Sequence, residues 1–183
     1  MKIENEILKD KTGEEILLRN AKEEDAQDLI SYLKITNAQS PYLICEPEEI
    51  TLTIEEKKEF IKRKNESKNE LLLLAFCGGK HIGNCSLMSV GSSIRYRHRC
   101  SVAIALYEEY CHRGIGRMML ESVLKIAKEI GYEQAELEVV TKNTGARALY
   151  EDMGFEKYGE LHNSTKYKDG SYTDSVLMVK RLV

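Results

Sequence analysis

The chain has 183 residues, with 27 Lys plus Arg against 30 Asp plus Glu, which gives a formal net charge of −3 at pH 7. That length suits one domain with a hydrophobic core, and 42% hydrophobic with 31% charged residues excludes a disordered or fibrous chain. The small acidic surplus argues against nucleic acid as a partner, because binding to phosphates draws on a surplus of Lys and Arg.

Cysteine usage and apolar runs indicate the compartment. The five cysteines are odd in number and contain no C-x-x-C pair, which argues against a disulfide framework. Residues 1–6 lack the apolar run of a secretory signal, and the longest such run, Leu71 to Cys77, is too short to span a bilayer. These features predict a cytoplasmic protein without a membrane partner. No linker divides the chain, so we expect one domain over residues 1–183, with residues 1–15 adding an N-terminal strand or hairpin.

The first third of the chain carries strand and then helix signals. Residues 7–8 and 16–18 flank a polar turn and predict a hairpin. Asn20 stands three residues before Glu23 and is expected to cap a first helix. The same pattern at residues 53–56 predicts a second, charged helix on the surface.

The rest of the chain alternates short strands with two helices. The expected order is strands over 71–77, 82–90 and 101–106, a helix from 114 to 131, a strand over 135–140, a helix over 144–153, and two strands joined by the turn Asp169-Gly170. Several connections are too short for crossovers between parallel strands. The prediction is therefore an α/β domain with a mixed, mostly antiparallel central sheet flanked by helices.

The stretch from 102 to 117 is the most informative for function. A predicted strand leads into a loop with glycines at 114 and 116, where a long helix begins. Unpaired N–H groups and the helix dipole favour an anion there, so the pattern is typical of a phosphate or pyrophosphate site, to which Arg113 and Arg117 add positive charge. Tight packing alone would also explain the glycines. The spacing matches neither the P-loop nor the dinucleotide fingerprint, which argues against ATP and NAD.

These residues are the ones in which the chain resembles the GNAT superfamily of acetyl-CoA-dependent N-acetyltransferases. Cys111 to Gly116 is similar to the family signature Q/R-x-x-G-x-G/A in both glycines. Residues 143–155, NTGARALYEDMGF, resemble the more specific segment N-x-x-A-x-x-L-Y-E-x-x-G-F. The similarity extends from about Ile16 to the end of the chain.

The resemblance implies a GNAT fold whose fourth and fifth sheet strands splay apart at a bulge in the fourth. It implies transfer of an acetyl group from acetyl-CoA to a primary amine of a small molecule or protein by direct attack, without a metal. A backbone N–H would stabilise the oxyanion, and Tyr150 would protonate the departing thiolate. The implied cofactor contacts lie on the strand, the loop and the second signature: Ile104, Ala105, Leu106, His112, Arg113, Gly114, Ile115, Gly116, Arg117, Asn143 and Ala146.

Two positions depart from the family pattern. Ser101 stands where many relatives carry a Glu that deprotonates the incoming ammonium, and Ser cannot serve as that base. Glu46, His98 and Glu138 are the candidates to replace it. Cys111 replaces the usual Gln or Arg, and we expect little effect because the cofactor contacts there are mainly from the backbone.

Structural interpretations stay open beside the functional ones. Tyr150 could simply pack in the core, and Asn143 could act as a helix N-cap, alone or in addition. Arg95, Arg97 and Arg99 would share one face if their segment is extended. The missing Glu keeps a non-catalytic acyl-CoA-binding regulatory module as the alternative function, and a structural protein that retains only the fold is a third reading.

The acceptor is expected between residues 35–51 and the hairpin near 167–174. The candidate contacts there are Tyr42, Glu46, Tyr172 and Asp174. The nature of the amine stays open, as does the oligomeric state, with a homodimer among the alternatives. Charge clustering predicts a basic cofactor side and an acidic acceptor side, which would suit an anionic donor and a cationic amine.

Overall fold

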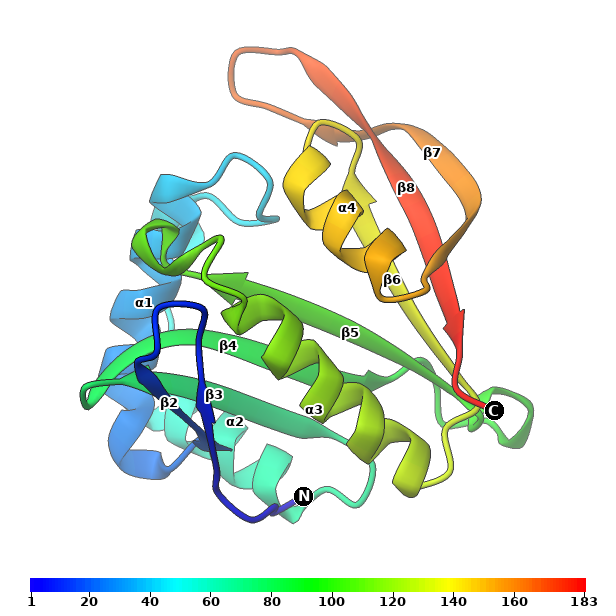
Figure 1. The fold of residues 1–183 in the computed structure, drawn as a ribbon. Coiled ribbons are helices and arrows are strands. Elements are labelled where there is room, and N and C mark those ends of the chain that lie inside the picture. The colour runs from blue at the N-terminus through cyan, green and yellow to red at the C-terminus, as the bar shows by residue number, and fades with distance from the viewer.

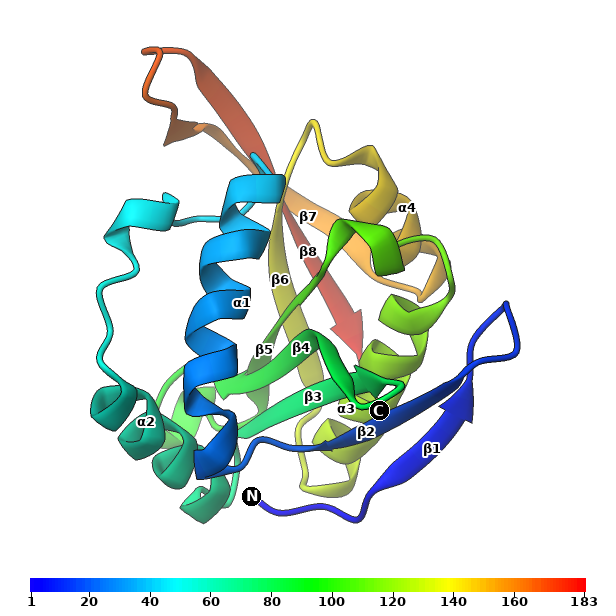
Figure 2. The same ribbon diagram turned by 90° about the vertical axis from the view of Figure 1, so that its left-hand side faces the viewer.

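The computed structural model describes residues 1–183 as one eight-stranded sheet with helices on both faces (Figures 1 and 2). The strand order is β1-β2-β3-β4-β5-β6-β8-β7, and every neighbouring pair is antiparallel except β5 and β6. The strands are β1 (Glu6–Lys9), β2 (Glu15–Asn20), β3 (Leu71–Cys77), β4 (Lys80–Ser89), β5 (Arg99–Leu106), β6 (Gln134–Val140), β7 (Glu156–Lys166) and β8 (Tyr172–Arg181). The helices are α1 (Ala26–Gln39), α2 (Ile54–Glu66), α3 (Ile115–Glu129) and α4 (Thr144–Asp152).

Two hydrophobic cores lie on opposite faces of the sheet. Leu71, Leu73 and Ala75 of β3 belong to the larger core, which includes the apolar faces of α3 and α4. Leu72 and Leu74 alternate with them and pack in the smaller core beneath α1 and α2. Because β3 is buried on both faces, its sequence is a continuous apolar run rather than an alternating one.

The ends of the helices show which local predictions were correct. Thr53 caps α2, and its hydroxyl accepts from the Glu56 N–H at 3.2 Å, as predicted. The helix α3 is followed by Gly131, whose φ of +97° is the left-handed conformation expected after a helix C-terminus. The α4 helix is capped by Asn143, whose side chain accepts from the Ala146 N–H at 3.2 Å.

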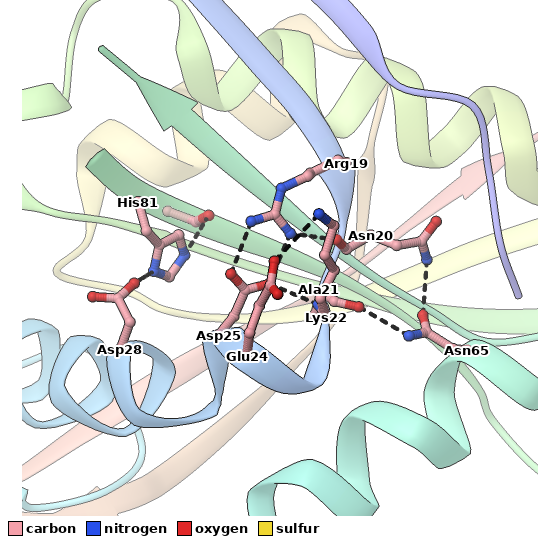
Figure 3. A network of polar contacts seen from close by, with 10 residues as sticks. Arg19, Asn20, Ala21, Lys22, Glu24, Asp25, Asp28, Asn65 and His81 are labelled. Carbon is pink, nitrogen blue, oxygen red and sulfur yellow. Dashed lines mark hydrogen bonds and ion pairs between the residues drawn. The ribbon is translucent and has the colours of Figure 1, made fainter. Parts of the chain in front are cut away.

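The predicted cap at Asn20 is wrong. Asn20 is the last residue of β2, and its side chain accepts from the Ile3 N–H and donates to Asn65. The entry to α1 is instead a 3-10 turn in which the Asp25 carboxylate accepts from the Lys22 N–H at 2.6 Å (Figure 3). The chain leaves the sheet two residues later than the pattern suggested.

The alternating arginines do not share a strand face. Residues Ile94–Tyr96 form a single 3-10 turn, so Arg95 and Arg97 precede the strand. Arg99 begins β5, and its Nη2 donates to Glu136 at 2.7 Å. The condition for a shared cationic face, an extended segment from Arg95 to Arg99, is therefore not met, because the segment turns before it pairs.

A polar network fastens α1 to the sheet (Figure 3). Arg19 of β2 forms an ion pair with Asp25 at 2.7 Å, and His81 of β4 contacts the Asp28 carboxylate at 2.9 Å. Next to this network, the fully buried Tyr32 donates its hydroxyl to the Ala105 carbonyl at 2.6 Å. The helix α1 is thereby tied to the strand that borders the candidate site.

No helix of this chain combines the length and the apolar composition needed to cross a membrane.

Candidate active site

The sheet opens between β5 and β6. These two strands pair only through Arg99, Cys100 and Ser101, which lie opposite residues 134–136. Beyond that point β5 continues to Leu106 and β6 to Val140, but the strands diverge, as Figure 1 shows in green and yellow. The result is a wedge-shaped gap in the middle of the sheet, with α3 and α4 on one face.

Unpaired backbone groups border this gap on both sides. Hydrogen bonds from the Tyr107 N–H to the Ile82 carbonyl (3.0 Å) and from the Val90 N–H to the Arg99 carbonyl (3.3 Å) show that the odd-numbered residues of β5 bond to β4. Antiparallel strands alternate, so the even-numbered residues direct their N–H and C=O groups toward β6. Ile104 therefore presents its backbone to the gap.

Leu106 also presents its backbone N–H and C=O groups to the gap, because it is another even-numbered residue of β5. On the opposite edge, the bond from the Thr141 N–H to the Asp174 carbonyl (2.9 Å) assigns the odd-numbered residues of β6 to β8. Glu138 and Val140 consequently point their backbone groups into the gap. An extended ligand placed there would find donors and acceptors on both sides, as a missing strand would.

Two expectations for β5 need correction. The register between β4 and β5 runs without interruption from Gly83 opposite Leu106 to Ser89 opposite Cys100, so β5 has no bulge. The two strands separate because β6 turns away after three residue pairs. Ala105, named as a cofactor contact, directs its backbone toward β4, and its carbonyl accepts from Tyr32.

A run of free amides lies in the loop before α3. From His112 to Arg117, six consecutive N–H groups donate to no acceptor within the chain, and the first helical bond is from the Met118 N–H to the Gly114 carbonyl at 3.2 Å. His112 and Gly114 have φ values of +62° and +85°, which shape the loop into a concave turn. No side chain caps this helix. Free amides and a helix dipole at this position favour an anion.

The amide loop, β5 and α4 meet at Gly116. A Cβ atom at this position would lie 3.5 Å from Leu149 Cδ2 of α4, and 3.7 and 3.8 Å from the δ-carbons of Leu106 and Ile104. The free amides and the strand gap are therefore adjacent.

The arginines of the loop are already engaged. Arg113 Nε donates to Asp10 at 2.6 Å, and its Nη2 donates to Glu14, both on the N-terminal hairpin. Arg117 pairs with Asp152 at 3.2 Å. Carboxylates thus largely neutralise the positive charge predicted from these two side chains. An anion would contact the backbone N–H groups of Arg113 and Arg117 instead.

Tyr150 occupies the inner face of α4. Its ring is buried, 8% exposed, and packs edge to face on Phe155 at 5.8 Å between centroids. Burial raises the pKa of the Tyr150 phenol to about 12, and no hydrogen bond to the protein modifies it. The phenol keeps its proton at neutral pH and has no protein acceptor to hold it.

The structure separates the three candidate bases. His98 lies at the closed end of the gap, where its carbonyl accepts from the N–H groups of Glu133 and Gln134 at 2.9 and 3.2 Å. Glu46 pairs with Lys168 at 3.2 Å. Glu138 is exposed, forms no ion pair and stands on β6 beside the gap. Because Leu137 and Val139 face the core of α3, Glu138 faces the opposite side of the sheet, where α1 lies.

The predicted acceptor residues are only partly brought together. Lys168 contacts both Glu46 and Glu48, which joins the β7–β8 turn to the connection between α1 and α2. Asp174 instead accepts from the Asn163 N–H at 2.8 Å and shares a strand face with Val176.

The aromatic candidates for the acceptor site differ in exposure. Tyr172 is 48% exposed and alternates onto the same face of β8 as Asp174, with Lys166 over its ring at 5.4 Å. Tyr42 is half-buried in the connection after α1. Two of the four predicted residues, Tyr172 and Asp174, thus lie on β8. Of the other two, Glu46 contacts the β7–β8 turn directly, through its ion pair with Lys168.

The family model described as "Acetyltransferase (GNAT) family" matches residues 27–155. The chain belongs to the GNAT acetyltransferase family. The N-alpha-acetyltransferase of Saccharolobus solfataricus is 36% identical over 101 residues, which is 55% of this chain and 57% of that protein. The N-alpha-acetyltransferase of Sulfurisphaera tokodaii is 37% identical over 82 residues, 44% of this chain and 47% of that protein. The chain spans from about a quarter to just over half the length of the curated relatives it matches.

Solved GNAT structures share the fold over almost their whole length. The GNAT acetyltransferase of Streptococcus pneumoniae has a TM-score of 0.86 and 29% identity, and the match covers 91% of this chain and 99% of that one. The yncA protein of Salmonella typhimurium, solved with its cofactor acetyl-CoA, has a TM-score of 0.80 over 92% and 94% of the two chains. At 15% identity this second likeness shows the fold alone.

Sequence reasoning missed the contact between the N-terminal hairpin and the amide loop. Asp10 and Arg113 are 103 residues apart, and the segment around Asp10 carries only a turn signal. It also missed Tyr32, whose hydroxyl reaches β5 from a helix that showed only core periodicity. Neither residue has a local pattern that would have distinguished it.

Proposed function

We propose that this protein transfers an acetyl group from acetyl-CoA to a primary amine of a small molecule or protein by direct attack. The observation that carries the proposal is the adjacency of the six free amides to the open edges of β5 and β6. Amides at a helix N-terminus suit a diphosphate, and unpaired strand edges suit the amide-bearing pantetheine arm. Acetyl-CoA would supply the thioester from which the acetyl group is transferred.

The chain's own groups supply the remaining chemistry. Backbone N–H groups of β5 that face the gap, at Ile104 and Leu106, are positioned to donate to an oxyanion that develops there. Tyr150, with its pKa raised to about 12 by burial, stays protonated and serves as the proton donor to the leaving thiolate.

Glu138 is the residue that we assign as general base. An ammonium group, with a pKa of about 8 at a peptide N-terminus and about 10.4 on an alkyl chain, must lose a proton before it can attack, and an exposed carboxylate can take that proton directly or through water. Glu138 stands beside the gap on the face opposite α3 and α4, so the amine would approach from that side. Its side chain has no competing ion pair, in contrast to Glu46.

The acceptor class to test first is a peptide N-terminus. Two relatives carry the name N-alpha-acetyltransferase, with 36% and 37% identity over parts of this chain. The ion pair between Lys168 and Glu46 joins the β7–β8 turn to the connection between α1 and α2, the two segments between which we expect the acceptor.

The test mixes the protein with acetyl-CoA and a panel of amines that includes short peptides with free N-termini, the same peptides blocked at the N-terminus, polyamines and amino sugars. We expect release of free thiol to match the amount of acetylated amine found by mass spectrometry. Binding of CoA by calorimetry without turnover of any amine would support the non-catalytic module instead. Absence of CoA binding would refute both functions.

A further inference from the structure

The N-terminal hairpin closes over one side of the amide loop. We infer that Lys11, at the tip of this hairpin, is the side chain that binds the diphosphate of CoA, while Arg113 of the loop itself serves to tie the hairpin down. This inference rests on the proposed acetyl-CoA function and adds a binding residue that lies outside both sequence signatures.

The side chain of Lys11 lies directly on the loop. Its backbone N–H donates to the Arg113 carbonyl at 3.0 Å. A Cβ atom placed on Gly114 would be 3.3 Å from Lys11 Cγ, 3.4 Å from Cε and 3.7 Å from Cδ, so the whole stem runs along this residue. Figure 1 shows the turn between β1 and β2 beside the first turn of α3. The stem of Lys11 thus lies against Gly114, one of the six residues whose N–H groups are free.

The charge balance of the loop singles out Lys11. Arg113 is bound to two carboxylates, and Arg117 pairs with Asp152 and, at 3.9 Å, with Glu121. Lys11 is exposed and forms no ion pair. A diphosphate placed on the amides would therefore meet the free ammonium of Lys11 rather than a free guanidinium.

Asp10 holds this arrangement in place. Its side chain is fully buried, and its Oδ1 accepts from the Thr12 N–H at 2.8 Å, the Thr12 hydroxyl at 2.7 Å and the Glu14 N–H at 3.1 Å. Its Oδ2 accepts from Arg113 Nε. Lys11 lies between two residues of this bonded turn, so its backbone is already ordered before a ligand binds. Such preorganisation lowers the entropy lost on binding.

A lysine that binds the diphosphate makes two distinct contributions. It adds a charge-assisted hydrogen bond that a thioester without phosphates cannot form. It also makes the affinity for CoA more sensitive to salt, because the interaction takes place at the surface. A residue needed only for folding would produce neither effect.

The experiment compares Lys11→Gln with Lys9→Gln. Lys9 is also exposed, lies two residues earlier on β1, and its replacement removes the same charge. Calorimetry gives the Kd for CoA at low and high salt, and steady-state assays give KM for acetyl-CoA and for S-acetyl-pantetheine, which lacks the diphosphate. We expect Lys11→Gln to weaken CoA binding about five- to tenfold at low salt and to leave KM for S-acetyl-pantetheine unchanged. Lys9→Gln should stay within about twofold of the parent for both thioesters.

The outcomes separate this inference from the proposed function. If the parent binds CoA and acetylates an amine while Lys11→Gln and Lys9→Gln behave alike, the role of Lys11 is refuted and the function stands. If Lys11→Gln raises KM equally for acetyl-CoA and for S-acetyl-pantetheine, the lysine contributes to the fold and not to binding of the diphosphate, which also refutes the inference. If the parent binds no CoA, both proposals fail.

Discussion

The phenolic oxygen of Tyr150 offers the most direct test of the chemistry. Tyr150→Phe removes this atom and nothing else. The side chain is 8% exposed, its ring packs on Phe155, and its hydroxyl makes no hydrogen bond to the protein. The variant therefore leaves no polar partner unsatisfied, and we expect its free energy of unfolding to stay within about 1 kcal/mol of the parent.

The expected loss of rate follows from the role that we propose for Tyr150 as proton donor. General acid catalysis contributes roughly 10²- to 10⁴-fold, and a thiolate whose acid has a pKa of about 8.5 is a tolerable leaving group without full protonation. We therefore expect kcat to fall about 10²- to 10³-fold, which corresponds to about 3 to 4 kcal/mol of activation free energy. The Kd for CoA and KM for the acceptor should change little.

The assay is steady-state release of thiol at saturating acetyl-CoA and acceptor, with Tyr132→Phe as the matched control. Tyr132 is also buried, at 3% exposed, and its hydroxyl donates to the Asn69 carbonyl at 3.0 Å at the far end of α3. The control should lose about 0.5 to 1.5 kcal/mol of stability and keep its kcat. A Tyr150→Phe variant as fast as the parent, or a control that is equally slow, would refute the reasoning.

Three further changes test the base, the hairpin and the core. Glu138→Gln should lower kcat/KM about 10- to 100-fold near pH 7 and recover as the pH approaches the pKa of the amine, because solvent then deprotonates it; an unchanged pH profile would place the base elsewhere. Burial opposes ionisation of Asp10, but hydrogen bonds from Thr12 and Arg113 outweigh it and lower the pKa of Asp10 from 3.8 to about 2. Its contribution to stability is therefore complete above pH 4 and is lost as the pH falls toward 2, so thermal melts of Asp10→Asn should depend less on pH in that window than those of the parent. Leu73→Ala, at a fully buried site, should cost about 2 to 5 kcal/mol in urea unfolding, whereas Ile44→Ala, at 98% exposed, should change stability by less than about 0.5 kcal/mol.

Elements whose side chains dictate the local backbone were predictable from the sequence. The hydroxyl of Thr53 caps α2 because Ser and Thr at that position satisfy a free N–H, and Gly131 follows α3 because glycine enters the left-handed region without strain. The amide loop was predictable for the same reason, since Gly114 has a φ of +85°.

Features set by tertiary pairing were not predictable. Asn20 has the right residue type for a cap, but its side chain is used to fix residues 1–3 and α2, and Asp25 takes the capping role. Whether the backbone groups of Ala105 point toward β4 or toward the gap depends on the register of β4 against β5. The spacing of apolar residues does not reveal that register. The contact of Arg113 with Asp10 joins two turns that are far apart in the chain.

The three residue pairs that join β5 to β6 are also the only strand pairing between the two halves of the sheet. Strands β1 to β5 form one block and β6 to β8 with α4 form another; little backbone hydrogen bonding links the two, and a single hydrophobic core packs against both. A ligand in the gap would bond to both blocks and complete the sheet as a ninth, non-covalent strand. Cohesion between the blocks would then rise with ligand concentration, by mass action on the closed state. Native-state hydrogen exchange would report this as protection gained at the amides that line the gap, far in excess of any change at the outer edges of the sheet.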